Sequence, residues 1–173
     1  IVPLLPPIAT ARDGRLPGGV QGQDRQETVL FVDLRGSTKL CEDRMPYDVM
    51  LILNRFFLEM SEALKLTNGH YANFNGDGLM ALYGLESGYE AGCREAIAGA
   101  VEMHRRMDRL NRSFESELGR ELRIGVGVHS GHAIVGSMGP PTTPIVSSIG
   151  DNVNVAARLE SLTKDFECGI VVS

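Results

Sequence analysis

The spacing of apolar residues changes repeatedly along this chain, and each change predicts a new element. Residues 29–34 form an apolar run with β-branched members, which predicts a buried strand. After Pro46 the apolar residues recur every three or four positions, which predicts a helix that carries the proline in its first turn. The apolar positions of this helix are Val49, Met50, Leu53, Phe56, Phe57, Met60 and Leu64.

Beyond this helix the pattern predicts a hairpin, a second long helix, three more strands, a third helix and a last strand. The hairpin has Gly76-Asp77-Gly78 as its turn, and Asp151 is expected to cap the third helix. The order of the elements predicts an α+β fold of the ferredoxin-like kind, with helices packed on one mainly antiparallel sheet. The elements are expected at residues 70–74, 79–84, 88–116, 123–131, 132–139, 145–150, 151–163 and 168–173.

The chain divides into a short segment and one domain. Residues 1–27 are rich in proline and glycine, which is typical of a linker or an extended arm. The remainder, residues 28–173, is long enough for one domain with its own core. Because the sequence starts with Ile1 and ends inside a predicted strand, we expect a fragment of a larger protein. The domain is then cut short at its C-terminus, and regulatory or membrane segments would lie elsewhere.

Composition and charge exclude some classes of protein. The apolar fraction of 43% and the charged fraction of 23% are typical of a soluble globular domain. The net charge of −5 argues against a nucleic-acid-binding protein, because a polyanion would be repelled. The three cysteines lack the spacing of zinc ligands, and no apolar run reaches the ~20 residues that span a bilayer. A cytoplasmic, reducing setting is therefore expected.

Asp33 and Asp77 are the first candidates for chemistry. Asp33 stands near the end of the first strand, and Asp77 stands between two glycines at the tip of the hairpin. If the two strands are neighbours, the carboxylates converge and favour a cation between them. Oxygen ligands of this kind suit Mg²⁺ or Mn²⁺. The alternative is that Asp33 caps the next helix and that Asp77 only completes an Asp-Gly turn.

The stretch LRGSTK, which follows Asp33, offers a candidate phosphate site. Gly36 permits a tight turn, and Ser37 and Thr38 begin the next helix. The free backbone N–H groups at such a helix start can bind phosphate oxygens. An ordinary capped helix is the alternative.

Asn154 and Arg158 form the third candidate group. They are four positions apart and therefore lie on one face of the predicted helix. The guanidinium fork of arginine matches phosphate oxygens, so this face could stabilise a phosphoryl group. The alternative is a solvated surface pair near Glu160 or Asp165.

Four motifs together resemble one family. FVDLRGST, NGDGLMALYG, GVGVHSGHAIVGSMG and SIGDNVNVAARLE occur in the order and spacing of the catalytic domain of class III nucleotidyl cyclases, over about residues 27–173. The resemblance implies that Asp33 and Asp77 hold two Mg²⁺ or Mn²⁺ ions, with the Leu34 carbonyl as a further ligand. It also implies that a short backbone stretch cradles the distal phosphates, formed by Arg35, Gly36, Ser37 and Thr38.

The resemblance further implies the reaction. The ribose 3′-oxygen of ATP attacks the α-phosphorus with the help of both metal ions, and cyclic AMP and pyrophosphate form. Asn154 orients the ribose, and Arg158 stabilises the charge that develops on the α-phosphate. In this family these two residues and the metal-binding aspartates come from different chains. A homodimer with two equivalent sites at its interface is therefore expected.

Two positions that the resemblance assigns to purine reading, Asn73 and Ser147, depart from the common patterns. Adenylyl cyclases commonly carry Lys at the first position and Asp, or Thr in one bacterial-type subclass, at the second. Guanylyl cyclases usually carry Glu at the first. Ser147 is nearest the Thr-bearing subclass, and the missing Glu favours ATP over GTP. The alternatives are a guanylyl or dual-specificity cyclase, or a regulatory module that binds nucleotide or dimerises without turnover.

Overall fold

The computed structural model describes residues 22–114, 118–140 and 142–173 of the chain. In this part of the chain the elements follow the expected order of strand, helix, hairpin, helix, strands, helix and strand, except that two helices, and not one, lie between the first strand and the hairpin. No helix in the described ranges has both the length and the apolar character needed to cross a bilayer. The elements are β1 (Gly22–Arg35), α1 (Ser37–Asp43), α2 (Pro46–Leu66), β2 (His70–Asn75), β3 (Gly78–Tyr83), α3 (Tyr89–Ser113), β4 (Arg123–Met138), β5 (Ile145–Ile149), α5 (Asp151–Asp165) and β6 (Ile170–Val172).

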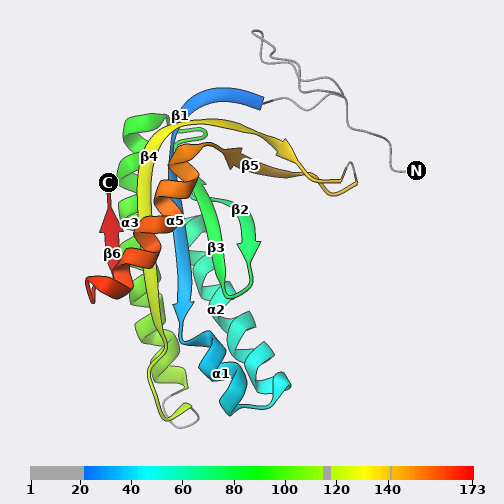
Figure 1. Cartoon of the computed structure of the whole chain (residues 1–173), viewed down its shortest axis with the longest axis vertical. Coiled ribbons are helices and arrows are strands. Elements are labelled where there is room, and N and C mark those ends of the chain that lie inside the picture. The colour runs from blue at the N-terminus through cyan, green and yellow to red at the C-terminus, as the bar shows by residue number, and fades with distance from the viewer. Residues whose placement is uncertain (1–21, 115–117, 141) are drawn as a thin grey trace.

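One mainly antiparallel sheet organises the domain (Figure 1). Its strands lie in the order β2-β3-β1-β4-β5, and β6 pairs with β4 in parallel while the other pairs are antiparallel. Helices α2 and α3 cover one face of the sheet, and α5 packs on the other. The prediction of an α+β fold with helices on a mainly antiparallel sheet is confirmed.

Strands β1 and β4 are longer than the sequence pattern indicates. Residues 22–27, which were expected in the linker, belong to β1, and residues 1–21 lie outside the described part of the chain. Residues 123–131 and 132–139 were expected as two strands, but β4 is continuous from Arg123 to Met138. The two strands lengthen each other, because their backbones pair in register along the whole of β1. The backbone hydrogen bonds to β4 therefore keep residues 22–27 in a strand, although these residues have no strand pattern in the sequence.

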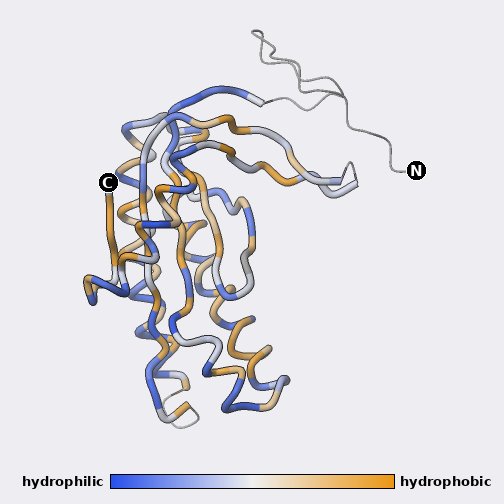
Figure 2. Tube along the Cα trace, viewed as in Figure 1, coloured by the Kyte–Doolittle hydropathy of each residue, from blue (hydrophilic) through white to orange (hydrophobic). Residues whose placement is uncertain are grey.

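The main apolar core lies between the sheet and helices α2 and α3. Alternate residues of β1 face it, namely Leu30, Val32 and Leu34. Val29 points to the opposite face, where a much smaller cluster packs against Ala156 of α5. Figure 2 shows apolar residues recurring along the strands and along α2 and α3. Most of the apolar burial that stabilises the domain is therefore on the α2 and α3 side.

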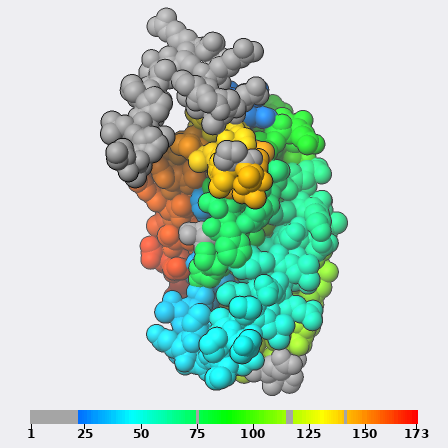
Figure 3. Space-filling view, turned by 90° about the vertical axis from the view of Figure 1, so that its right-hand side faces the viewer, coloured from blue at the N-terminus to red at the C-terminus, as the bar shows by residue number. Residues whose placement is uncertain are grey.

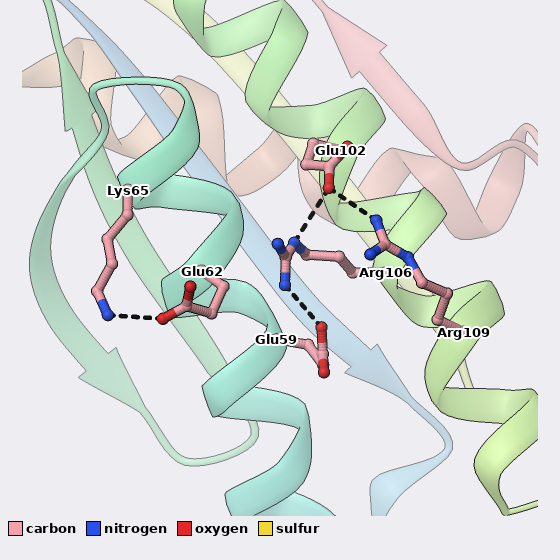
Figure 4. A network of polar contacts seen from close by, with 6 residues as sticks. All are labelled: Glu59, Glu62, Lys65, Glu102, Arg106 and Arg109. Atoms are coloured by element: carbon pink, nitrogen blue, oxygen red, sulfur yellow. Dashed lines mark hydrogen bonds and ion pairs between the residues drawn. The ribbon is translucent and has the colours of Figure 1, made fainter.

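A network of ion pairs joins α2 and α3 beside this core (Figure 4). Nitrogen atoms of Arg106 lie 2.9 Å from a carboxylate oxygen of Glu59 on α2 and 3.1 Å from one of Glu102 on α3. Arg109 adds a second contact to Glu102 at 3.0 Å. The Arg106 side chain is only 12% exposed, so these contacts are better shielded from water and salt than ordinary surface pairs. The network holds the two helices in fixed register.

Helix α5 lies directly on the backbone of β4. An ideal Cβ placed on Gly127 would overlap the backbone of Ala156 and Glu160 in α5. The sequence therefore needs a residue without a side chain at this point of the strand. This contact sets how closely α5 approaches the sheet.

The start of α5 differs from the prediction. Gly150 occupies the N-cap position, and no side chain makes a capping hydrogen bond there. Asp151 is the first helical residue, so its carboxylate is favourably placed at the positive end of the helix dipole but does not cap the helix. The prediction of Asp151 as the cap is wrong by one position.

Replacing Gly127 with alanine tests the packing of α5. Gly127→Ala is expected to lower the free energy of unfolding by roughly 1–3 kcal/mol, because the methyl group overlaps the α5 backbone. Urea unfolding of the purified domain measures the change. Gly131→Ala is the matched control on β4, since its methyl would meet only Asn152 Cβ at 3.3 Å and His129 Nε2 at 3.6 Å. Equal destabilisation by both variants would contradict the close contact at Gly127.

Candidate functional site

Asp33 lies near the end of β1 on the face that α5 covers. Its neighbours in the sheet are Gly78 of β3 and Gly125 of β4. A Cβ on Gly78 would lie only 2.7 Å from Asp33 Oδ1, so the carboxylate occupies the space that a side chain would fill. The two glycines therefore leave room around the Asp33 carboxylate.

Asp77 is brought to Asp33 by the hairpin turn between β2 and β3. The backbone N–H of Leu34 donates to the Asp77 carbonyl oxygen at 3.1 Å. The Ser37 hydroxyl at the start of α1 donates to Asp77 Oδ2. Gly76 has a φ of 63°, which lets the chain turn sharply before Asp77. The structure thus brings Asp33 and Asp77 together, as the sequence predicts for neighbouring strands, and places Leu34 and Ser37 beside Asp77.

The electrostatics of this pair fit a divalent cation. Burial, and then the charge of Asp77, raise the pKa of Asp33 from 3.8 to about 7. Two nearby carboxylates with few opposing charges favour a bound cation, and their oxygens suit a hard ion. Among the described residues, no three His, Cys, Asp or Glu side chains lie close enough to hold a metal ion together. Two carboxylates suffice for Mg²⁺, which commonly completes its shell with water and substrate phosphates.

Glu160 is a third carboxylate near this pair, and the sequence reasoning misplaced it. The sequence pattern places it at the surface near Arg158, but it is only 8% exposed and faces the sheet. Its Oε1 is buried without a hydrogen-bond partner among the described residues and lies 2.7 Å from the position of a Cβ on Gly125. Burial raises the pKa of Glu160, and its charge in turn raises that of Asp33. Its helical spacing from Asn152 and Ala156 is the signal that could have revealed its burial.

The predicted phosphate-binding stretch makes a tight turn between β1 and α1. Gly36 has a φ of 71° and precedes the first residue of α1. The side chain of Arg35 donates to the Cys168 carbonyl oxygen at 2.9 Å, so it is held by the protein itself. Thr38 is exposed. The backbone of this stretch, and not the Arg35 side chain, is the part that could meet phosphates.

Asn154 and Arg158 lie on the exposed side of α5. The opposite side of the helix is buried against the sheet, through Asn152, Ala156, Glu160 and Thr163. Neither the Asn154 nor the Arg158 side chain has a hydrogen bond or an ion pair with a described residue. The structure confirms that they share a helix face, but a single chain does not bring them to Asp33 and Asp77.

Asn73 and Ser147 come from two elements that touch. Asn73 lies at an irregular point of β2, is exposed, and accepts a hydrogen bond from the Phe74 backbone N–H at 2.8 Å through its Oδ1. Ser147 lies on β5 and is 5% exposed. Strand β5 contacts β2, so the two residues lie on neighbouring elements. The side-chain oxygen of Asn73 therefore already has a hydrogen-bond donor within its own chain.

Removing the charge of Asp77 tests the electrostatics of the carboxylate pair. In metal-free protein, Asp77→Asn is expected to lower the pKa of Asp33 from about 7, because the charge that opposes ionisation is lost. Carbon-13 NMR titration of the Asp33 carboxyl group measures this. The raised pKa of Asp33 also predicts that wild-type stability falls as the pH rises through about 7, and that the fall is weaker in the variant. Ser37→Ala, which keeps the charge, is the control; an unchanged Asp33 titration in Asp77→Asn would contradict the coupling.

Comparisons with known proteins agree on one family. The model of the adenylate and guanylate cyclase catalytic domain matches residues 20–172. The adenylate cyclase of Anabaena cylindrica is 31% identical over 153 residues, which are 86% of this chain and 30% of that protein. The crystal structure of the adenylyl cyclase CyaB from P. aeruginosa superposes with a TM-score of 0.80 at 30% identity, covering 88% of this chain and 78% of that one. The guanylyl cyclase Cya2 gives a TM-score of 0.75 at 31% identity, covering 81% and 71%.

These relatives include cyclases named for both purines, so they agree on the family and not on the nucleotide. The chain spans less than a third of the length of the Anabaena relative. The matched residues include the hairpin with Asp77, the turn after Asp33 and the whole of α5. This chain belongs to the family of adenylate and guanylate cyclase catalytic domains.

Proposed function

We propose that this domain converts ATP to 3′,5′-cyclic AMP and pyrophosphate. The observation that carries the proposal is the convergence of Asp33 and Asp77, with the Leu34 N–H bonded to the Asp77 carbonyl. This arrangement holds two carboxylates at the end of a strand, and divalent cations held by them would supply the positive charge that an attacking hydroxyl and a triphosphate need. Family membership supports the same reaction.

Asp33 and Asp77, with the Leu34 carbonyl, would hold two Mg²⁺ or Mn²⁺ ions. When bound, such ions lower the pKa of the ribose 3′-hydroxyl and stabilise negative charge on the α-phosphate and the triphosphate. The Ser37 hydroxyl orients one oxygen of Asp77 by hydrogen bonding to it. The backbone after Asp33 turns through Gly36 and offers N–H groups to the distal phosphates.

Asn154 and Arg158 act on a nucleotide held by a second copy of the chain. Both are exposed on α5 and have no partner among the described residues, which leaves them free to reach across an interface. Asn154 orients the ribose, and Arg158 stabilises the charge on the α-phosphate. Two copies related by two-fold symmetry then form two equivalent sites.

Exposed apolar side chains support a homodimer. The β4–β5 ribbon projects from the body of the domain, and in Figure 3 its yellow tip stands above the green β2–β3 hairpin. Ile149 on β5 is 58% exposed and Phe74 on β2 is 48% exposed. Apolar side chains gathered on a projecting ribbon and an edge strand favour burial against another chain. The same homodimer would work on the cytoplasmic side, a setting that three free cysteines suit.

Mixing two inactive variants tests the shared site. Asp77→Ala and Arg158→Ala are each expected to lose at least about a thousandfold in kcat while remaining folded by circular dichroism. Mixed and re-equilibrated, they are expected to recover roughly a quarter of wild-type activity, because half of the dimers are mixed and each has one intact site. A cyclic AMP assay with ATP and Mn²⁺ measures this. Arg158→Ala mixed with Asn154→Ala is the control, since both changes fall in the same half-site and no intact site forms. Recovery in the control, or none in the test pair, would contradict sites built from two chains.

The identity of the purine is tested at Asn73. An amide can donate or accept, whereas a lysine ammonium only donates and suits N1 of adenine over the N1–H of guanine. Asn73→Lys is therefore expected to raise the ratio of kcat/KM for ATP to that for GTP by about tenfold or more. Side-by-side turnover of the two nucleotides measures the ratio. Asn54→Lys, the same change on the exposed face of α2, is the control, and an unchanged ratio in Asn73→Lys would remove Asn73 from base reading.

A second candidate is a nucleotide-binding or dimerising module without turnover. It is favoured by one observation, namely that the Asn73 Oδ1 already accepts a hydrogen bond from the Phe74 backbone, which leaves this oxygen one acceptor site for a base. Calorimetric ATP binding without any cyclic product, at high protein concentration with Mn²⁺, would favour this module. A GTP preference in the turnover comparison would favour a guanylyl cyclase.

A further inference from the structure

Glu27 is a buried carboxyl that the proposed reaction does not use. It lies on β1 on the same face as Asp33, but six residues away along the strand, and it is 0% exposed. It forms no ion pair with a described residue. Burying a carboxylate without a counter-charge is costly, and an apolar side chain would pack there without this cost. Its presence therefore calls for a role beyond packing.

The polar contacts of Glu27 come from two other elements. The Ser148 hydroxyl of β5 donates to Glu27 Oε1. The Asn152 amide, in the first turn of α5, also faces the Glu27 carboxyl. Asn152 Nδ2 donates to the Gly131 carbonyl oxygen at 3.4 Å, and Gly131 is the residue opposite Glu27 in β4. The carboxyl thus lies between β1, β4, β5 and α5.

Two acceptor oxygens in this cluster have no donor. Glu27 Oε2 and Asn152 Oδ1 are both buried without a hydrogen-bond partner among the described residues. A proton on Glu27 Oε2 would turn this unpaired acceptor into a donor, and the unpaired Oδ1 of the facing Asn152 amide is the acceptor that we assign to it. One proton therefore removes two unfavourable buried groups. An ionised Glu27 would leave the Asn152 oxygen unpaired.

The charges around the cluster do not favour ionisation. Burial raises the pKa of Glu27, and this outweighs the opposing effects of Ser148, Asn152 and Arg25. The Arg25 guanidinium is committed to the carbonyl oxygens of Gly84 and Leu85, at 2.9 and 2.7 Å. The other charged groups on the packed elements are at the surface, since His132 of β4 pairs with Asp24 and Asp151 of α5 is exposed. Glu27 therefore forms no ion pair with a described residue, and the charge of Arg25 only partly offsets the cost of its burial.

The cluster holds both sides of the junction between β5 and α5. Ser148 follows Ser147, the position assigned to purine reading, and Asn152 precedes Asn154 by two residues. We propose that Glu27 is a neutral, hydrogen-bonded acid that positions the β5–α5 junction through Ser148 and Asn152, and so sets the placement of Ser147 and Asn154 at the nucleotide. This rests on the proposed function for the roles of those two residues. The state of Glu27 itself is independent of any turnover.

Replacing Glu27 with glutamine mimics the neutral acid. The glutamine oxygen can accept from Ser148, and its amino group can donate to Asn152 Oδ1. Glu27→Gln is expected to keep the KM for ATP within about twofold of wild type. Glu27→Met has a similar length but no polar atoms and leaves Ser148 and Asn152 unpaired, so its KM is expected to rise about tenfold. Ser148→Ala is expected to lie between the two.

Two further measurements do not depend on catalysis. Infrared difference spectra of metal-free wild type and Glu27→Gln at neutral pH are expected to show one protonated carboxyl band that the variant lacks. Urea unfolding is expected to show that wild-type stability falls more steeply than that of Glu27→Gln as the pH rises above the unfolded-state value near 4.5. This sign follows because a raised pKa in the folded state makes the neutral form the stabilising one, and its contribution is lost as the group ionises.

The outcomes separate this proposal from the proposed function. Absence of the carboxyl band, with a uniform loss of stability in Glu27→Gln at every pH, would mean an ionised Glu27 and would overturn the proposal. A Glu27→Met variant that loses stability but keeps the wild-type KM would overturn the positioning role. If wild-type protein forms no cyclic AMP, the same comparison is made with the Kd for a non-hydrolysable ATP analogue. The failure of the reaction is then distinct from the failure of the Glu27 assignment.

Discussion

The direct contact between the backbones of α5 and β4 decides how the rest of the domain is arranged. Because Gly127 has no side chain, the turn of α5 that contains Ala156 and Glu160 rests on the strand itself. With the helix fixed at this height and rotation, one side of α5 meets the sheet and the other faces outward. Asn154 and Arg158 fall on the outward side. A single packing constraint thus determines which residues of the helix meet the chain's own sheet and which face outward.

The two faces of the sheet differ in what they bury. The face under α2 and α3 holds the larger apolar core and the Arg106 network, so most of the stabilising burial lies there. The face under α5 holds Asp33, Glu27 and Glu160 with only a small apolar cluster. Strand β1 belongs to both, because its residues alternate between the faces. Packing on the α2 and α3 side therefore fixes the position of β1, which carries Asp33 and Glu27 on its other side.

Much of this arrangement could be predicted from the sequence, and the failures have physical causes. The periodic helices and the hairpin follow from spacing, because the buried faces of these elements are continuous. The convergence of Asp33 and Asp77 follows only if the first strand and the hairpin are neighbours, which the pairing of β1 with β3 provides. The early start of β1 at Gly22 could not be predicted, since pairing with β4 sustains a stretch whose own residues are polar. Glu27 and Glu160 were missed because acidic residues are assumed to be exposed. Because side chains alternate along a strand, Glu27 must lie on the same face of β1 as Val29 and Asp33, which is the face that α5 covers.

The contact between α5 and the sheet contains buried polar atoms without hydrogen-bond partners. In the described part of the chain, the three buried side-chain oxygens without a partner are Glu27 Oε2, Asn152 Oδ1 and Glu160 Oε1, and all lie between α5 and the sheet. Each such atom costs desolvation energy that an apolar side chain would avoid. Those of Glu27 and Asn152 lie around the start of α5, near Ser147 and Asn154, and the third lies near Asp33. Because an interface that only had to be stable would not collect these groups, the unpaired oxygens of Glu27 and Asn152 support the positioning role proposed for Glu27 at the β5–α5 junction.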